Sequence, residues 1–435
     1  MKITFLGAGS TVFARNVLGD VMQTDVLRDS EIALYDINPE RLDDSFRILS
    51  NINKNSNDNR AELKTFCGLD ELKASLEGAD FVVNAVQVGG FDPGTIRDFE
   101  IPKKYGLRQT IADTIGVGGV FRALRTIPVM QQFADAIEEV CPDAWLLNYS
   151  NPMSILTGYM QRYTKVKTVG LCHSVQVVAR ELVKGVGLEY TDDITSKVAG
   201  INHMAWLLEI KKDGVDMYPE IKQRSLDGHV PDGDRVRHDL MQRFGYYITE
   251  SSEHNSEYHP YYIKDKYPDL IERYNIPLDE YIRRCIRQID EWTSMRDSLV
   301  DDPDLTHERS HEYASYIMEA MATDKPYKIG GNVLNTGLIT NLPQNACVEV
   351  PCLVDASGIT PTYVGDLPEM QAALNRTNVN VHLLTIQASR TLKKEDVYAA
   401  VSMDPHTASE LSLDDIRAMC DELFEAHSDM MPEYH

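Results

Sequence analysis

Residues 2–11 read Lys-Ile-Thr-Phe-Leu-Gly-Ala-Gly-Ser-Thr, and the fold class follows from this stretch. Its first five residues are an apolar run rich in β-formers, the glycines follow at once, and residues 12–22 have helical spacing. Strand, glycine turn and helix N-terminus are the three parts of a dinucleotide-binding unit. Gly7 permits the tight turn, and Gly9 lets the backbone approach a pyrophosphate held by the free N–H groups of the helix. Val12 departs from the pattern, because a third glycine is usual there.

An acidic residue stands at the end of the next predicted strand. Residues 32–35 are apolar and Asp36 follows them. Its carboxylate would accept hydrogen bonds from both ribose hydroxyls and would repel a 2′-phosphate, so NAD is favoured over NADP. The alternative interpretation is an ordinary strand–helix turn. The candidate cofactor-binding residues are Gly7, Gly9, Ser10, Thr11, Asp36 and Asn84.

The first 170 residues alternate predicted strands with helical patterns. The predicted strands are 2–6, 32–36, 62–66, 81–85, 144–147 and 166–170, and the clearest helices are 39–52 and 119–140. This alternation indicates an α/β fold with a Rossmann-type, doubly wound parallel sheet, whose ligands lie beyond the carboxyl ends of the strands. At 435 residues the chain is longer than one core usually holds. We expect a dinucleotide-binding domain over 1–194 and a substrate and oligomerisation domain over 195–435.

In the second half of the chain, the regular alternation of predicted strands and helices ends. Residues 197–200 and 205–210 are predicted strands, residues 306–322 a helix, residues 331–361 strand-like, and the region from 367 helical. We therefore expect a mixed α/β domain of the lactate/malate-dehydrogenase type.

Composition excludes several classes of protein. The net charge is −24 and Lys and Arg form no cluster, so no nucleic acid is expected. No run approaches the ~20 apolar residues of a membrane span. The predicted strand at residues 2–6 leaves no room for a signal peptide. Seven cysteines without a paired framework indicate reduced thiols and a cytoplasmic protein.

Two residues that end predicted strands suit a metal. Cys172 follows one strand and His203 follows another, and thiolate with imidazole favours a transition metal. From spacing alone, a buried thiol and a hydrogen-bonded core histidine are equally acceptable. Nearby asparagines are polar groups where a substrate would lie. They are Asn148, Asn151 and Asn202.

Residues 249–262 are the most polar and aromatic part of the chain. Rings beside carboxylates and imidazoles suit a sugar-binding surface or an acid–base site, and a solvated loop anchored by tyrosines is the alternative. Arg97, Arg122 and Arg125 are candidates for holding substrate or cofactor. For Arg122 and Arg125 a structural salt bridge is an equally good interpretation.

Six segments together resemble glycoside hydrolase family four over the whole chain, and within it the bacterial α-galactosidases. The family match lies in Gly-Ala-Gly-Ser-Thr-Val-Phe at 7–13, Gln-Thr-Ile-Ala-Asp-Thr at 109–114, the glycine and arginine positions of 118–128, Leu-Asn-Tyr-Ser-Asn-Pro-Met at 147–153, Val-Gly-Leu-Cys-His-Ser at 169–174 and Gly-Ile-Asn-His-Met at 200–204. The narrower match lies in Cys-His-Ser at 172–174, Thr-Glu-Ser-Ser-Glu-His at 249–254 and Asn-Leu-Pro-Gln at 341–344.

The resemblance implies hydrolysis by oxidation and elimination. NAD oxidises carbon 3 of the sugar, a divalent metal, by family habit manganese, assists elimination, water adds, and the ketone is reduced again. Most glycosidases use a pair of catalytic carboxylates, and this NAD-dependent family is an exception to that rule, which agrees with the scheme. The resemblance assigns the metal ligands to Cys172 and His203, substrate binding to Asn148 or Asn151, and the base to Tyr258. In the phospho-glucosidase branch an acid follows the metal cysteine. In this chain His173 follows the cysteine instead. His173 is therefore the candidate for protonating the leaving oxygen, although the resemblance leaves the identity of this proton donor open.

The expected substrate is an unphosphorylated α-galactoside such as melibiose, with an α-glucoside or a galacturonide as the nearest alternative. No cluster of Lys or Arg in the substrate loops would hold a phosphate. A hydroxy-acid dehydrogenase of the lactate/malate type is a rival that needs an Arg–His–Asp constellation, and Cys172 with His203 argues against it. A third class is a non-catalytic NAD-binding sensor, for which the sequence offers no positive feature. We expect a homo-oligomer, dimer or tetramer.

Overall fold

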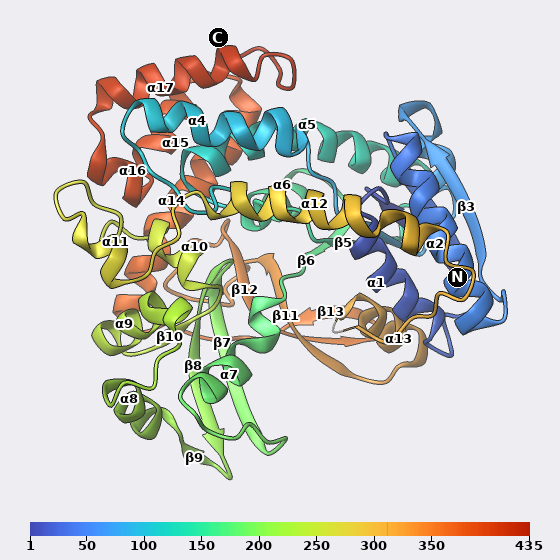
Figure 1. The fold of residues 1–435 in the computed structure, drawn as a ribbon, viewed down its shortest axis with the longest axis horizontal. Coiled ribbons are helices and arrows are strands. Elements are labelled where there is room, and N and C mark those ends of the chain that lie inside the picture. The colour runs from blue at the N-terminus through green and yellow to red at the C-terminus, as the bar shows by residue number, and fades with distance from the viewer. Residues whose placement is uncertain (311) are drawn as a thin grey trace.

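The computed structural model describes residues 1–310 and 312–435. Within these residues, thirteen strands form one sheet (Figure 1). One half of the sheet is parallel and carries the N-terminal region, and the other half is antiparallel. The order along the main path is β10-β8-β7-β12-β11-β6-β5-β4-β1-β2-β3, with β13 beside β12 and β9 beside β8.

The parallel half confirms the predicted doubly wound sheet. Its six strands pair in the order β3-β2-β1-β4-β5-β6, and the predicted bounds are right to within about two residues. They are β1 (Lys2–Leu6), β2 (Glu31–Asp36), β3 (Glu62–Cys67), β4 (Phe81–Asn84), β5 (Trp145–Asn148) and β6 (Lys167–Gly170). The central strands are buried and apolar on both faces, as expected of a sheet covered by helices on each side.

Helices connect these strands. They are α1 (Thr11–Met22), α2 (Pro39–Asn57), α3 (Leu72–Leu76), α4 (Ile96–Lys104), α5 (Gly116–Val140), α6 (Met153–Tyr163) and α7 (Ser174–Gly185), with the short η1 (Leu69–Glu71) and η2 (Gly90–Thr95). The apolar faces of α1 and α2 pack on one side of β1 and β2 in a core that includes Val17, Leu18 and Ile48. A second apolar cluster, with Ile127 of α5 and Leu156 of α6, includes Leu6 and Leu146 of the strands. These helices hold the strand ends in place.

The second half confirms the predicted mixed α/β character. Its strands are β7 (Ile194–Ile201), β8 (Met204–Lys212), β9 (Val215–Asp216), β10 (Tyr247–Ile248), β11 (Tyr327–Leu334), β12 (Cys347–Asp355) and β13 (Gly358–Pro361). Its helices are α8 (Tyr218–Leu226), η3 (Asp232–Asp234), α9 (Arg235–Phe244), α10 (Ser252–Glu257), α11 (Asp269–Arg273), α12 (Glu280–Val300), α13 (Ala314–Thr323), α14 (Glu369–Thr391), α15 (Lys394–Ser402), α16 (Pro405–Glu410) and α17 (Leu413–Ala426). The division between residues 194 and 195 stays a prediction, and the sheet is hydrogen-bonded across it.

The predicted helix over 306–322 is wrong in its first part. The helix α13 begins only at Ala314, and residue 311 lies outside the described residues. The segment before it is held non-helical by the buried Asp20 of α1, which accepts hydrogen bonds from the His307 ring (2.7 Å) and from the backbone N–H (2.8 Å) and hydroxyl (2.6 Å) of Ser310. Tertiary hydrogen bonds therefore override the local helical pattern.

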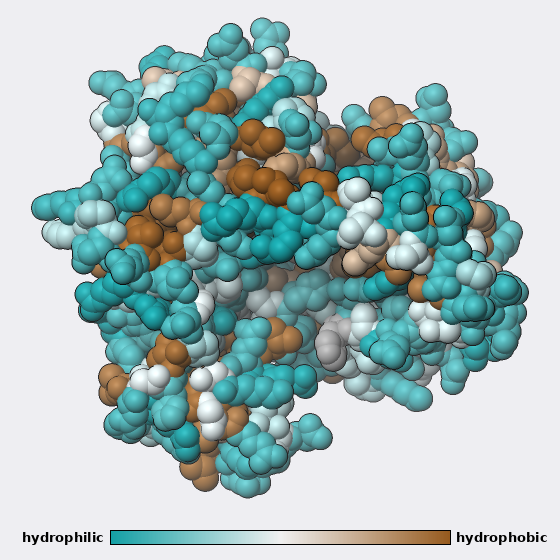
Figure 2. Space-filling model, viewed as in Figure 1, coloured by the Kyte–Doolittle hydropathy of each residue, from teal (hydrophilic) through white to brown (hydrophobic). Residues whose placement is uncertain are grey.

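The sequence analysis missed the long helix α12. It runs across the face shown in Figure 1 toward α2, where Arg296 makes a bidentate ion pair with Asp44. Figure 2 shows this face to be mostly hydrophilic, and hollowed between the lobe with β8, β9 and α8 and the lobe with α1, α2 and α13. None of the described helices is both long enough and apolar enough to cross a membrane.

Candidate active site

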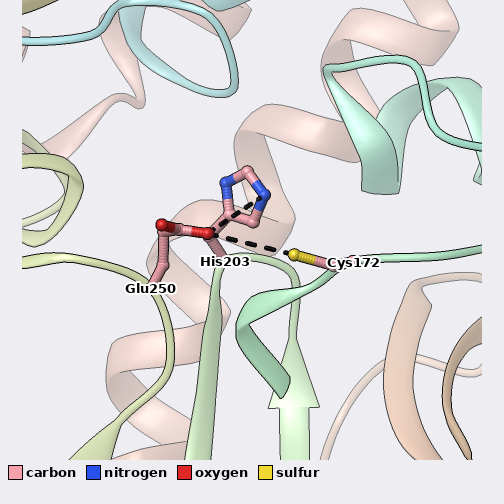
Figure 3. Close-up of side chains that lie close together, drawn as sticks. All are labelled: Cys172, His203 and Glu250. Carbon is pink, nitrogen blue, oxygen red and sulfur yellow. Dashed lines mark hydrogen bonds and ion pairs between the residues drawn. The ribbon is translucent and has the colours of Figure 1, made fainter. Parts of the chain in front are cut away.

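Three potential metal ligands meet where the two halves of the sheet join (Figure 3). Oε2 of Glu250 lies 3.9 Å from Sγ of Cys172 and 3.7 Å from Nε2 of His203. One donor atom from each residue lies within 4.8 Å of the other two. A sulfur, a nitrogen and an oxygen donor suit a divalent transition metal. The structure thus brings together both predicted ligands and adds Glu250, which the sequence analysis had placed only within a general sugar or acid–base stretch.

The strand ends position this cluster. Cys172 comes two residues after β6, and His203 lies in the turn between β7 and β8. Glu250 follows β10, which is fastened to β8 because Thr249 exchanges hydrogen bonds with Ala205 at 2.8 and 3.0 Å. Glu250 has φ +62°, a left-handed conformation that is uncommon outside glycine and that occurs where surrounding structure fixes a functional residue.

The charges of Glu250 and His203 in the cluster oppose each other. Burial opposes ionisation of Glu250, but the facing rings of His254 and His203 outweigh it and lower the pKa of the carboxyl to about 2. Burial likewise disfavours a charged His203, yet Cys172 and Glu250 raise the pKa of this imidazole to about 10. In the metal-free protein the imidazolium balances the acidic donors, and a bound metal ion would take over that charge.

Tyr258 lies on the other side of His203. Its hydroxyl is 3.2 Å from Nδ1, and the hydroxyl of Thr114 lies at the same distance from that atom. The ring therefore presents Nε2 to the Cys172–Glu250 side and Nδ1 to the two hydroxyls. Burial, and then the charges of Asp113, Glu257 and Glu250, raise the pKa of Tyr258 well above its usual value. Without a nearby cation this phenol holds its proton.

Asp113 and Asn151 form a polar wall beside the cluster. Oδ2 of Asp113 accepts a hydrogen bond from the Asn151 amide at 3.3 Å, and Oδ1 lies 3.9 Å from Nε2 of His254. Burial opposes the charge of Asp113, but Arg122 and His254 lower its pKa. Arg122 also donates to the backbone oxygen of Asn151 at 3.3 Å. The buried side-chain oxygen of Asn151 has no partner among the described residues, so it is available to a sugar hydroxyl.

Asn148 and Asn84 lie deeper than predicted. Both are fully buried, and the Asn84 amide donates to the Asn148 side-chain oxygen at 2.8 Å. The Asn148 amide donates to Ser150 and Thr157, each at 3.2 Å. These bonds use both sides of the Asn148 amide to fix the ends of β4 and β5. A substrate role for Asn148 and a cofactor role for Asn84 stay predictions.

Asn202 is also buried, at 1% exposure. Neither its side-chain nitrogen nor its side-chain oxygen has a partner among the described residues. Because unpaired buried amides are costly, this residue is better suited than Asn148 to receive a polar ligand. Its predicted role in substrate binding stays a prediction.

His173 extends from the start of α7 with about half of its side chain exposed. Rings of Phe13, Tyr149 and Tyr313 surround it, and Nε2 lies 2.5 Å from Oε2 of Glu312. Burial disfavours the charged imidazole, but the hydrogen bond and charge of Glu312 outweigh it and raise the pKa of His173. The sequence offered no signal for Glu312, which is far from His173 along the chain.

The glycine turn has the geometry of a dinucleotide cradle. Gly7 has φ +87°, and a Cβ on Gly9 would lie 2.8 Å from the Asp36 carboxylate. That carboxylate accepts from the Gly9 N–H at 2.7 Å and from the Asn38 N–H at 2.8 Å. Helix α1 begins at Thr11, and the preceding Ser10 makes no side-chain cap. The N-terminal N–H groups of α1 thus stay available to an anion.

The three arginines differ in their surroundings. Arg97 on α4 pairs with Asp429 at 2.9 Å, so its predicted substrate role stays a prediction. Arg125 is fully buried and makes a bidentate ion pair with Asp98, at 3.0 and 2.5 Å, which supports the structural interpretation. Arg122 alone faces the polar wall described above.

Comparison with known proteins gives the class. The family model described as "Family 4 glycosyl hydrolase" matches residues 2–188, and "Family 4 glycosyl hydrolase C-terminal domain" matches residues 198–407. The chain belongs to the family 4 glycosyl hydrolases.

Two relatives and one solved structure narrow the comparison. The chain is 59% identical to an alpha-galactosidase of Bacillus subtilis, covering 100% of this chain and 99% of that one. It is 34% identical to an alpha-galactosidase of Rhizobium meliloti, covering 100% and 89%. The 6-phospho-beta glucosidase of Thermotoga maritima, solved with manganese, NAD⁺ and glucose-6-phosphate, superposes with a TM-score of 0.79 at 22% identity, covering 100% of both chains. This last likeness shows a shared fold.

Proposed function

We propose that this chain hydrolyses terminal α-D-galactosides such as melibiose, with NAD and a divalent metal, expected to be manganese, as cofactors. The observation that carries the proposal is the Cys172–His203–Glu250 cluster, which lies beyond the strand ends of a dinucleotide-binding sheet and beside Tyr258. The two alpha-galactosidase relatives support the same substrate class.

The residues present fit both cofactors. The cradle of Gly7 and Gly9 and the uncapped start of α1 suit a pyrophosphate, and Asp36 suits a ribose. Cys172, His203 and Glu250 supply donors of the types that hold a divalent transition metal and leave further positions for sugar oxygens. When bound, NAD supplies reversible oxidation at carbon 3, and the metal stabilises negative charge on the oxygens of carbons 2 and 3.

Tyr258 acts as the base at carbon 2. His203 would hold the metal through Nε2, which would leave the ring proton on Nδ1, 3.2 Å from the Tyr258 oxygen that could accept it. This hydrogen bond and the metal charge favour the phenolate, which burial otherwise disfavours. Tyr258 is therefore a base only in the loaded enzyme.

His173 protonates the leaving oxygen in this proposal. Glu312 holds its Nε2 and raises its pKa, which favours the protonated imidazole that a general acid needs. Its side chain is half exposed and it directly follows the metal-ligand candidate Cys172 in the chain, which suits a group that meets the departing aglycone. Asn151 and Asn202 orient sugar hydroxyls with the amide atoms described above.

A single assay separates the function classes. The protein is incubated with NAD⁺, Mn²⁺, a thiol reductant and nitrophenyl α-galactoside, while nitrophenol and NADH are followed together. A galactosidase of this type releases nitrophenol with no net NADH, whereas a hydroxy-acid dehydrogenase accumulates NADH from its hydroxy acid. A sensor does neither. Faster turnover of the α-glucoside or the α-galacturonide would reassign the sugar within the family.

The charges near the site favour a substrate without phosphate. Arg284 is held by Glu253 at 2.6 Å, and Arg237 by Asp234 at 2.5 Å. A phosphate would have to break such pairs or meet the acidic cluster around Glu250. Free galactosides should therefore be cleaved faster than their 6-phosphates, and the reverse order would refute this part of the proposal.

Assembly and location complete the proposal. Residues 1–194 hold the dinucleotide, and residues 195–435 complete the sugar site and mediate a homo-oligomer, dimer or tetramer, in the cytoplasm. Light scattering on the purified protein measures the oligomer, and a monomeric mass in the active enzyme would contradict this part.

A further inference from the structure

One row of four residues connects β6, β11, β12 and β7, across the join between the parallel and antiparallel halves of the sheet. Asn332 of β11 pairs with Gly170 of β6, and Glu349 of β12 pairs with Gly200 of β7. Asn332 and Glu349 also face each other across β11 and β12. The β6–β11 pairing, which joins the two halves, and the β12–β7 pairing, which lies within the antiparallel half, each rest on a single residue pair, so this row links the strand before Cys172 to the strand before His203.

Two of the candidate metal ligands follow directly from the ends of this row. Cys172 comes two residues after Gly170, and His203 three residues after Gly200. The backbones approach closely at both ends. A Cβ on Gly170 would lie 2.8 Å from the Asn332 side chain, and one on Gly200 would lie 2.7 Å from the Ala205 backbone.

The side chains in the middle of the row bind each other and the strand that leads to Cys172. The Asn332 amide donates to Oε1 of Glu349 at 2.9 Å and to the backbone oxygen of Gly170 at 3.3 Å. Both side chains are fully buried. Asn332 thus links Glu349 of β12 to the end of β6, and Glu349 itself pairs with Gly200 of β7. These contacts connect the ends of β6 and β7.

Burying the polar side chains of Asn332 and Glu349 costs free energy. Burial raises the pKa of Glu349 to about 7, although the hydrogen bond from Asn332 and the charge of His203 favour the ionised carboxylate. Apolar side chains of similar size would fill a buried row of strands at lower cost. The mechanism above uses neither residue, and the hydrogen bond fixes geometry in a way that apolar packing does not.

We infer that Asn332 and Glu349 are positioning residues that set the separation of Cys172 and His203, and through it the affinity of the site for a divalent metal. The inference rests on the proposed metal site. It concerns binding of the metal and needs no substrate or turnover to test.

The test uses the full-length, metal-free protein and four variants. Glu349→Leu and Asn332→Leu remove the hydrogen bond, whereas Glu349→Gln keeps an oxygen that can accept from Asn332. Val354→Ala is the matched control, because Val354 is fully buried in the same strand but pairs with Tyr327, five positions from Glu349. Mn²⁺ affinity is measured by calorimetry, and Co²⁺ is used to record the thiolate charge-transfer band of Cys172.

The two Leu variants should bind Mn²⁺ about 10- to 100-fold more weakly and show a weakened or shifted thiolate band, which is the usual effect of losing a group that orients metal ligands. Glu349→Gln should stay within about threefold of the wild type by this reasoning. Val354→Ala should lower the melting temperature and leave both metal readouts unchanged. Asn332→Ser, which is too short to reach Glu349, replaces any Leu variant that does not fold, with the same expected loss.

Two outcomes overturn the inference. Wild-type affinity and spectrum in the Leu or Ser variants would mean that the pair does not position the ligands. An equal loss in Val354→Ala would mean that any destabilisation of the strand has the same effect. If the wild type itself binds no Mn²⁺, the proposed metal site fails as well, which distinguishes the two failures.

Discussion

Glu312 lies 2.5 Å from Nε2 of His173, although 139 residues separate them in the chain. The carboxylate raises the pKa of an imidazole whose side chain is half exposed. An imidazole held by a carboxylate is a common arrangement for a general acid or base, because the partner both orients the ring and stabilises its charged form.

His173→Gln should slow hydrolysis of melibiose about 10²- to 10⁴-fold, the usual range for losing a general acid. Nitrophenyl α-galactoside should be affected much less, because nitrophenolate leaves without protonation. Glu312→Gln should give the same pattern with a smaller loss. The two substrates are compared by kcat/KM, and an equal loss on both would show that His173 does not donate the proton.

Tyr258→Phe should leave NAD and Mn²⁺ binding nearly intact and lower turnover about 10²- to 10⁴-fold, because the base at carbon 2 is lost. Exchange of the carbon 2 proton with deuterated solvent, followed by NMR, should slow equally. Tyr247→Phe is the control, since Tyr247 is also buried but its hydroxyl donates to Asp234. Unchanged exchange in Tyr258→Phe would point to Tyr261, Tyr262 or His254 as the base.

Cys172 should be the thiol whose alkylation or oxidation removes activity, because a metal-binding cysteine reacts as the thiolate. Burial raises the pKa of five other thiols, which makes them less reactive; they are Cys141, Cys285, Cys347, Cys352 and Cys420. Iodoacetamide labelling is mapped by mass spectrometry with and without Mn²⁺. Bound Mn²⁺ should protect Cys172 from alkylation. Activity lost in air should return with a thiol reductant plus Mn²⁺.

Cys67→Ser provides the control, because Cys67 is the one partly exposed cysteine among the described residues. It should be inactivated like the wild type. Cys172→Ser with wild-type metal dependence would refute the ligand assignment.

Acid should destabilise the fold through His382. Burial lowers the pKa of this α14 imidazole to about 4 from its usual 6.5, so it is neutral in the folded protein and takes up a proton more readily when unfolded. Its contribution to stability is complete above pH 6.5 and is lost as pH falls toward 4, by about 2 kcal/mol between pH 7.5 and 5.

His382→Gln should therefore shrink the difference in unfolding free energy between pH 7.5 and pH 5 by about 2 kcal/mol, as measured by denaturant titration. His229→Gln, at an exposed position, should leave that difference as it is in the wild type. An unchanged difference in His382→Gln would show that the imidazole is not buried in its neutral form.

Local pattern predicted the parallel half of the sheet well. Buried strands such as β1 and β4 are short apolar runs closed by turns, and these signals lie within a few residues of each other. The same reasoning failed at residues 306–310, where hydrogen bonds to the Asp20 carboxylate, far earlier in the chain, override the helical pattern. It also missed α12, which lies mostly exposed on the surface and buries only Cys285 and Val300 of its residues.

The sequence by itself determined the dinucleotide cradle, the family, and Cys172, His203 and Tyr258 as candidates, because each is written in a short motif. Only the tertiary structure decided that Glu250 joins the metal cluster, that Glu312 holds His173, and that Asn148 is held in the interior. The physical reason is that these relations depend on where strand ends converge. A hydrogen bond or a metal site needs atoms a few ångströms apart, and the chain brings such atoms together from positions that no local pattern connects.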